Sequence, residues 1–238
     1  MSNLIIDIGS TAVKAAKAEG ELLGKTYRYQ GERVCDFIMS LARAEKPHEM
    51  IISSSTDISQ SDINAYSSVC GKLVLVDNKI KEKYGLPDWL TPDRTATVLA
   101  VRKMFAGKGC TIIDLGTTMT IDVIDAEGNY IGGNVSLGLR ARLKAINRYS
   151  RSFPLVELTE IDCILGHSMQ TSIVSGVTRG IIFEIEGYES RFAGNITVFT
   201  GGDAIYFAKK MKNSIFVSCN LVLIGLVLLS DTYDGKEY

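Results

Sequence analysis

Short apolar runs bounded by glycine and acidic residues dominate the first third of the chain. Runs of this kind, apolar throughout or alternating with polar residues, predict strands joined by tight turns. We expect strands at residues 4–8, 13–17, 22–29, 49–55 and 72–77. Between them, apolar positions recur at helical spacing over residues 32–44, which predicts an amphipathic helix.

The same pattern returns in the second part of the chain. Aligned on their aspartates, Ile5-Ile6-Asp7 corresponds to Ile112-Ile113-Asp114, Gly9 to Gly116, and Lys14 to Ile121. Strands are expected in the segments CTIIDLG, MTIDVID, NYIGGNVS and NITVFT, and helices over residues 137–149, 168–191 and 203–212. An echo this long predicts a duplicated domain, since solenoid repeats recur every ~20–50 residues. We place the two halves at residues 1–107 and 108–238.

Strands that alternate with helices indicate an α/β fold with a largely covered sheet. A long apolar run near the end, from Asn220 to Ser230, is too short to span a ~30 Å hydrocarbon core, so we expect a buried C-terminal helix. The N-terminus lacks a basic segment followed by an apolar one, which argues against a signal peptide. We therefore expect a soluble cytoplasmic protein with no membrane partner.

Composition narrows the function classes only slightly. The chain has 26 basic and 27 acidic residues, and this balance gives no indication of nucleic-acid binding. Its five cysteines lie far apart and form no CxxC pair, as expected for small buried residues in a reducing compartment.

The repeated aspartate-glycine turn is the strongest chemical signal. Gly9 and Gly116 let backbone N–H groups approach an anion closely, and Lys14 adds a positive charge. The hydroxyl donors beside them are Ser10, Thr11, Thr117 and Thr118. The carboxylates of Asp7 and Asp114 would repel an anion unless a cation lay between, which suggests a polyphosphate with its metal ion. The alternative is that aspartate-glycine merely forms two hairpin turns.

A third glycine turn, TGGDA at residues 200–204, follows the apolar segment ITVF. Two glycines at the end of a strand suit the close approach of a planar group or a phosphate, so we assign Gly201 and Gly202 to the nucleotide. The alternative is a plain strand-to-helix turn with Asp203 as the helix cap.

Further segments complete an ordered series: YGLP at 84–87, TPDR at 91–94, DLGTTMTID at 114–122, YIGGNVSLGL at 130–139 and LGHSMQTSIVSGV at 165–177. With DIGSTAVK at 7–14 and FTGGDA at 199–204, the series resembles type III pantothenate kinases, within the acetate and sugar kinase/Hsp70/actin superfamily. The resemblance covers essentially the whole chain. It implies duplicated ribonuclease H-like (actin-like ATPase) domains with a cleft between them.

The resemblance also implies ATP-dependent phosphorylation of pantothenate to 4′-phosphopantothenate, the first step of coenzyme A synthesis, by a homodimer that uses Mg²⁺ and a monovalent cation, K⁺ or NH₄⁺. The implied phosphate loop consists of Asp7, Ile8, Gly9, Ser10, Thr11, Ala12, Val13 and Lys14. Asp93 becomes the general base, Asp114 the monovalent-cation ligand and Thr117 a nucleotide contact. Pantothenate would be held by Tyr84, Thr91, Pro92, Asp93, Arg94 and Met169.

Some positions depart from the family pattern. Ser10 replaces an asparagine, Thr91 replaces a glycine, and Met169 stands where the family has a substrate-contacting threonine. Loss of one polar contact at Met169 would lower substrate affinity, by ~1 kcal/mol, rather than remove the chemistry. Two alternatives stay open: a kinase or phosphatase of the same superfamily acting on another small substrate, and a catalytically idle regulatory relative.

Overall fold

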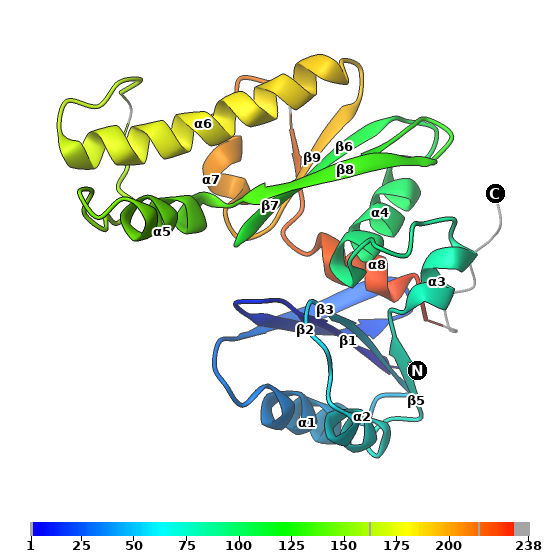
Figure 1. Ribbon diagram of the computed structural model, residues 1–238. Helices are drawn as coiled ribbons and strands as arrows, with labels where there is room; N and C mark the ends of the chain where they lie inside the picture. The colour runs from blue at the N-terminus through cyan, green and yellow to red at the C-terminus, as the bar shows by residue number, and fades with distance from the viewer. Residues whose placement is uncertain (1, 162, 214, 231–238) are drawn as a thin grey trace. The chain divides into compact units, whose positions relative to one another are not determined.

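The computed structural model describes residues 2–161, 163–213 and 215–230 (Figure 1). The described residues form two compact units: those up to Ala106 together with those from Asn220 to Ser230, and those from Gly107 to Cys219. The expected halves, 1–107 and 108–238, are therefore corrected at the C-terminal end. The last described segment belongs to the first unit, because its helix packs against a helix of that unit.

The first unit is built on a five-stranded mixed sheet with the strand order β3-β2-β1-β4-β5. Its strands are β1 (Ser2–Ile8), β2 (Val13–Glu19), β3 (Leu22–Tyr29), β4 (Glu49–Ser54) and β5 (Lys72–Leu75). β1, β2 and β3 are antiparallel neighbours, whereas β4 runs parallel to β1 and to β5. These five strands confirm the strands expected from the sequence.

Helices cover both faces of this sheet (Figure 1). They are α1 (Val34–Glu45), α2 (Gln60–Ser67), α3 (Asn78–Lys83), α4 (Pro92–Met104) and α8 (Leu221–Val227). Successive side chains of a strand point to opposite faces. Leu4 and Ile6 accordingly pack in one core with α1 and α2, while Ile5 packs in another with α4 and α8. The sheet is thus buried on both sides, as its near-continuous apolar runs predict.

Helices α4 and α8 approach each other closely at Gly225. A Cβ atom built there would lie 1.8 Å from the carbonyl oxygen of Ala96. No side chain fits at that distance, so the contact requires glycine. This close packing places the apolar C-terminal run, expected as a buried helix, in the core of the first unit.

The second unit repeats the same sheet, in the order β10-β9-β6-β7-β8. Its strands are β6 (Cys110–Leu115), β7 (Thr118–Ile124), β8 (Tyr130–Leu137), β9 (Ile196–Thr200) and β10 (Phe216–Val217). The antiparallel pairs β6–β7 and β7–β8 and the parallel pairs β6–β9 and β9–β10 match the first unit strand for strand. The predicted duplication is confirmed at the level of topology.

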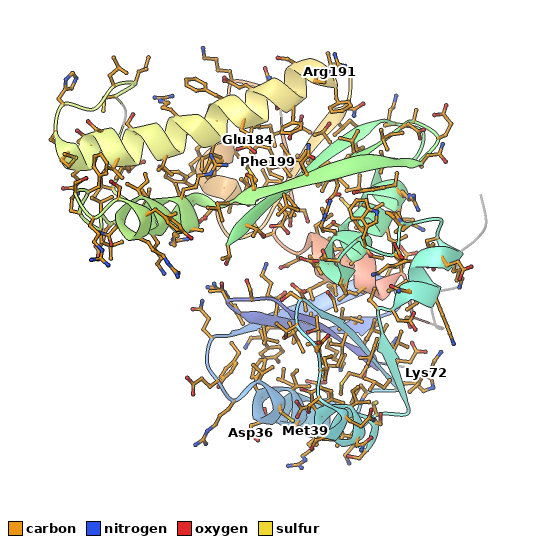
Figure 2. The ribbon with its side chains drawn as sticks, viewed as in Figure 1. Asp36, Met39, Lys72, Glu184, Arg191 and Phe199 are labelled. Carbon is orange, nitrogen blue, oxygen red and sulfur yellow. The ribbon has the colours of Figure 1, made fainter. Side chains whose placement is uncertain are left out.

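Three helices belong to this unit: α5 (Leu139–Tyr149), α6 (Met169–Arg191) and α7 (Ala204–Ala208). Phe199 on β9 packs into a core with residues of α5 and α6. Arg142 of α5 donates a hydrogen bond to Glu184 of α6. Phe199 and Glu184 are labelled in Figure 2. Helix α7 is shorter than the expected 203–212. Its end tightens into a turn in which the Lys210 N–H bonds the Phe207 carbonyl at 2.8 Å.

The two aspartate turns differ in length by one residue. Asp7 lies opposite Lys14 in the β1–β2 ladder, whereas Asp114 lies opposite Thr120 in the β6–β7 ladder. The alignment of Lys14 with Ile121 is therefore wrong. Because side chains alternate along a strand, the shorter turn gives the Lys14 position to Thr120 and sends Ile121 into the core.

No helix among the described residues combines the length and apolarity needed to cross a membrane.

Candidate active site

The turn between β1 and β2 holds the predicted phosphate loop. The Gly9 N–H donates to the carbonyl of Ala12 at 3.1 Å, which closes a short turn from which the side chains of Ser10 and Thr11 are exposed. Lys14 and Asp7 are directly opposite each other on β2 and β1. The structure thus brings the charged and hydroxyl members of this loop into one turn.

Because side chains alternate along a strand, the position of Asp7 in β1 shows to which face of the sheet Asp7 and Lys14 point. Asp7 lies two residues after Ile5, which packs with α4 and α8, so Asp7 and its partner Lys14 point to that same face. Helix α4 begins with the Pro92-Asp93-Arg94 segment. The phosphate loop and the helix with the predicted base are therefore on one side of one sheet.

Ser53 is a neighbour of this loop that the sequence analysis did not single out. It lies opposite Asp7 on β4, its side chain is fully buried, and its Oγ has no hydrogen-bond partner among the described residues. A buried hydroxyl without a partner is unusual in a folded protein. The signal in the sequence was the hydroxyl run SSST after an apolar strand, at residues 53–56.

The predicted substrate segment begins where α3 ends. Gly85 has φ +62°, and the N–H groups of Gly85 and Leu86 bond the carbonyls of Glu82 and Lys81 at 3.0 and 2.8 Å. This is a Schellman motif, which needs a left-handed residue and so explains the glycine after Tyr84. Arg102 Nη1 of α4 donates to the Tyr84 carbonyl at 2.8 Å, which fixes the backbone of Tyr84 against α4.

Asp93 sits in the first turn of α4. Thr91 precedes the helix without a side-chain capping bond, and Pro92 opens it. Asp93 Oδ1 is buried and has no hydrogen-bond partner among the described residues. A buried carboxylate oxygen at the positive end of a helix, left without a protein donor, suits a ligand that brings a hydroxyl group. Arg94, the next residue, is only 6% exposed.

The second aspartate turn is packed against the glycine turn that follows β9. A Cβ atom at Gly201, where φ is +91°, would lie 2.4 Å from Asp114 Oδ1 and 2.6 Å from the Leu115 carbonyl oxygen. The Asp203 N–H also donates to that carbonyl, at 2.9 Å. The predicted contacts Asp114, Thr117, Gly201 and Gly202 are thus gathered in the second unit.

Gly138 closes the other side of this turn. Its N–H donates to the Thr117 carbonyl at 3.0 Å, and a Cβ atom there would lie 2.0 Å from the Gly116 carbonyl oxygen. This contact holds residue 138 in an extended conformation, and α5 begins one residue later. Arg140 in its first turn pairs with Asp203 at 2.9 Å, an ion pair that the sequence did not indicate.

The described side chains near the two turns form no protein cage for a metal ion. Among the described residues, no three His, Cys, Asp or Glu side chains form a group that could hold a metal ion. Asp114 Oδ1 and the Leu115 carbonyl oxygen both lie so close to Gly201 that no Cβ atom fits there. A Mg²⁺ ion held mainly through nucleotide phosphates does not need a protein cage.

Met169, the remaining residue of the predicted substrate site, lies in the first turn of α6. It is 51% exposed and lines an apolar groove of about 630 Å³ between α5 and α6, together with Ile146 and Phe153. The hydroxyl of the nearby Thr171 already has a hydrogen-bond partner at the helix end. Its Oγ1 accepts a hydrogen bond from the N–H of Ser168 at 2.9 Å and completes a capping box. It therefore does not take over a substrate contact from position 169.

Three of the five cysteines have thiols with a raised pKa. All five are free thiols. Burial raises the pKa of Cys110 to about 11 and also raises the pKa of Cys35 and Cys70. Because only the thiolate is a good nucleophile, these three remain inert near neutral pH.

Solved structures with this fold include nucleotide-binding enzymes. A Campylobacter jejuni protein described as a conserved Baf family transcriptional activator superimposes with a TM-score of 0.63 at 18% identity, covering 95% of this chain and 97% of that one. An activator of 2-hydroxyisocaproyl-CoA dehydratase from Clostridium difficile, with bound ADPNP, gives 0.59 at 14%, covering 96% and 94%. The ROK hexokinase of Thermus thermophilus gives 0.54 at 15%, covering 96% and 98%. These likenesses establish the duplicated actin-like ATPase and sugar-kinase fold.

Sequence relatives are more specific. A type III pantothenate kinase of Flavobacterium johnsoniae is 31% identical over 241 residues, which cover 98% of each chain. One of Cytophaga hutchinsonii is 34% identical, covering 94% of this chain and 96% of the relative. The family model for type III pantothenate kinases matches residues 3–191, and this stretch includes both aspartate turns and the Asp93 segment. The chain belongs to the type III pantothenate kinase family.

Proposed function

We propose that this kinase transfers the γ-phosphoryl group of ATP to the primary hydroxyl of pantothenate, with Asp93 as the general base. The product, 4′-phosphopantothenate, begins coenzyme A synthesis. The observation that carries the proposed role of Asp93 is its buried Oδ1, which has no hydrogen-bond partner among the described residues. Such an oxygen is ready to accept the proton of a bound hydroxyl group.

Phosphoryl transfer requires positioning and charge neutralisation more than covalent help. Asp93 would orient the hydroxyl and take its proton as the new P–O bond forms. Arg94, the next residue, offers a planar pair of donors that matches the carboxylate of pantothenate. Tyr84, Thr91 and Pro92 would complete the acceptor site.

The nucleotide and its ions are assigned to the two turns. The loop from Asp7 to Lys14, with Ser53 beside it, would hold the phosphates and their Mg²⁺. Asp114, with the carbonyl of Leu115, would hold K⁺ or NH₄⁺, and Thr117, Gly201 and Gly202 would contact the nucleotide. When bound, the cations supply positive charge that offsets the charge developing on the transferred group.

We also propose that the active form is a homodimer, as expected from the family resemblance. The exposed side chain of Met169 and the apolar groove beside it support an interaction of this face with another surface. Equilibrium sedimentation of the purified protein should give twice the chain mass; a monomer at micromolar concentration would contradict this part of the proposal.

The activity is tested by ADP release in a mixture of ATP, Mg²⁺, K⁺ and pantothenate. We expect pantothenate-dependent turnover and a product that carries one phosphate. If ATP binds but pantothenate does not stimulate turnover, the substrate assignment is wrong. A panel of small alcohols would then identify another acceptor, and inactivity towards the whole panel would favour an idle relative.

A further inference from the structure

The loop between α3 and α4 presents an exposed aromatic side chain beside the proposed acceptor site. Trp89 is the only tryptophan in the 238 residues, and 57% of its surface is exposed. Its ring centroid lies 5.5 Å from Cζ of Arg94, within the range of a cation–π contact. Tryptophan is highly buried on average and is enriched where a protein surface binds a partner.

The backbone on either side of Trp89 is firmly anchored. On one side, the buried amine of Lys81 donates to the carbonyl of Asp88 at 2.7 Å and to Asn78 Oδ1 at 3.1 Å. On the other side, the side chain of Leu90 is fully buried and its N–H bonds the carbonyl of Pro87 at 3.1 Å. The indole is therefore presented by a fixed turn rather than by a loose loop.

The position of Trp89 matters because its contact partner, Arg94, is the residue proposed to bind the carboxylate of the substrate. It follows Asp93 directly, in the first turn of α4, and only 6% of it is exposed. A guanidinium group binds a carboxylate well only in one plane, because two parallel N–H bonds must form at once. An aromatic ring against the guanidinium restricts that plane.

We propose that Trp89 is a positioning residue for acceptor recognition: it holds the Arg94 guanidinium in the plane that receives the carboxylate of the substrate. This inference rests on the proposed function, since it takes pantothenate as the acceptor. Trp89 acts on binding of the acidic end of the substrate and not on the proton transfer at Asp93. It thereby favours acceptors that carry a carboxylate over neutral analogues.

The test compares Trp89→Leu and Trp89→Phe with the wild type, using pantothenate and an analogue in which its carboxylate is an amide. The leucine variant keeps apolar bulk but loses the ring, so we expect KM for pantothenate to rise about five- to tenfold. Its kcat, its KM for ATP and its KM for the neutral analogue should stay within about twofold of wild type, since Trp89 does not touch the reacting atoms. The phenylalanine variant should recover most of the loss.

Tyr149→Leu provides a matched control. Tyr149 is 83% exposed, and Arg148 lies 5.9 Å from its ring, but this pair lies at the end of α5, in the second unit, and is not part of the acceptor segment. Loss of an exposed cation–aromatic pair should not change KM for pantothenate there. The single tryptophan gives a second measurement, because indole emission of the wild type should change when pantothenate is added without ATP. Trp89→Phe has no tryptophan and supplies the background signal.

KM values for pantothenate and for the neutral analogue, measured on one preparation, distinguish a positioning role of Trp89 from a general loss of folded protein. If KM rises equally for pantothenate and for the neutral analogue, or if Trp89→Leu behaves as wild type while the wild type phosphorylates pantothenate, the inference is overturned and the proposed function stands. If the wild type shows neither turnover nor an emission change with pantothenate, the proposed function fails, and the inference fails with it.

Discussion

Asp93 occupies a position where an aspartate usually has a local structural role. A carboxylate in the first turn of a helix commonly caps an N–H group or interacts with the positive end of the helix. One atom distinguishes a role in helix capping from a role in ligand binding: Asp93 Oδ1 is buried and accepts no hydrogen bond from the described residues. The residue type serves the helix, whereas the unused oxygen points to a ligand.

Replacing Asp93 by asparagine should lower kcat by ~10²–10⁴-fold, because the amide cannot accept the proton. ATP binding, measured by calorimetry without pantothenate, should change little. Asp88→Asn is the matched control, since this exposed aspartate is in the same loop and only its backbone carbonyl is used. Equal turnover in Asp93→Asn and Asp88→Asn would remove Asp93 from the mechanism.

A second prediction at the scale of one residue concerns the substitution Gly201→Ala. Its φ of +91° and the 2.4 Å approach to Asp114 Oδ1 both exclude a side chain. Gly201→Ala should displace Asp114 and raise the K⁺ concentration for half-maximal activity by about tenfold or more, equivalent to ~1.4 kcal/mol of binding energy.

Gly194→Ala controls for backbone strain in that experiment. Gly194 also has a positive φ, +100°, but a Cβ atom there meets nothing within 4 Å. Both variants should lose some thermal stability, because a left-handed alanine costs ~1–2 kcal/mol. Only Gly201→Ala should change the K⁺ requirement. A matching change in Gly194→Ala would show that general destabilisation, and not Asp114, is responsible.

At the scale of elements, most strands and the long helices follow from local pattern. The apolar run of β1 and the helical spacing of α1 needed no tertiary information, and Ser168 correctly marked the start of α6. What local pattern could not supply was the length of the second aspartate turn. Two alignments one residue apart look equally good in sequence, and only the β6–β7 register places Thr120 opposite Asp114.

The residues of the proposed site likewise fall into those that the sequence alone reveals and those that only the fold reveals. The glycines and aspartates of the turns were visible because their residue types are needed for close approach and charge. Ser53 and Arg140 were missed, since each becomes relevant only through a partner distant in sequence: Asp7 for Ser53 and Asp203 for Arg140. The placement of α8 was missed for the same reason, because an apolar run does not indicate which sheet it covers.

The α4–α8 contact gives an element-scale prediction. Gly225→Ala should lower the free energy of unfolding by more than the ~1–3 kcal/mol typical of overpacking, because the new Cβ would meet the Ala96 carbonyl at 1.8 Å. Gly187→Ala, on an exposed face of α6 with nothing within 4 Å, should instead add up to ~1 kcal/mol through helix propensity. Urea unfolding curves of both variants measure this, and equal stability would rule out close packing at Gly225.

At the scale of the whole molecule, the first unit is discontinuous in sequence and the second is continuous. Val222, Leu223, Leu226 and Val227 of α8 share a core with β1, β2, β4 and α4. Asn3 on β1 also joins Glu49 on β4 and Ser230 in a buried network, with Asn3 Nδ2 donating to Ser230 Oγ at 2.6 Å. Residues from both ends of the chain therefore stabilise one sheet.

This organisation predicts how fragments behave. Residues 1–106 alone should not unfold cooperatively, because one face of their sheet would lack the apolar cover of α8. The same residues joined through a glycine-serine linker to residues 220–238 should show a single thermal transition, and residues 107–219 should fold alone. Circular dichroism melts test all three fragments. A cooperative melt of 1–106 alone would show that α8 is dispensable.

The position of α8 also bears on the order in which the protein is completed during synthesis. Domains generally fold as units in the order in which they leave the ribosome. Here a segment that follows the second unit in sequence completes the first unit, so the second unit can finish folding while the first still waits for this helix. A chain that stops shortly before residue 220 would carry every proposed catalytic residue and still expose an open apolar sheet face, which chaperones and proteases recognise. Helix α8 thus makes the stability of the first unit depend on translation that continues beyond the second.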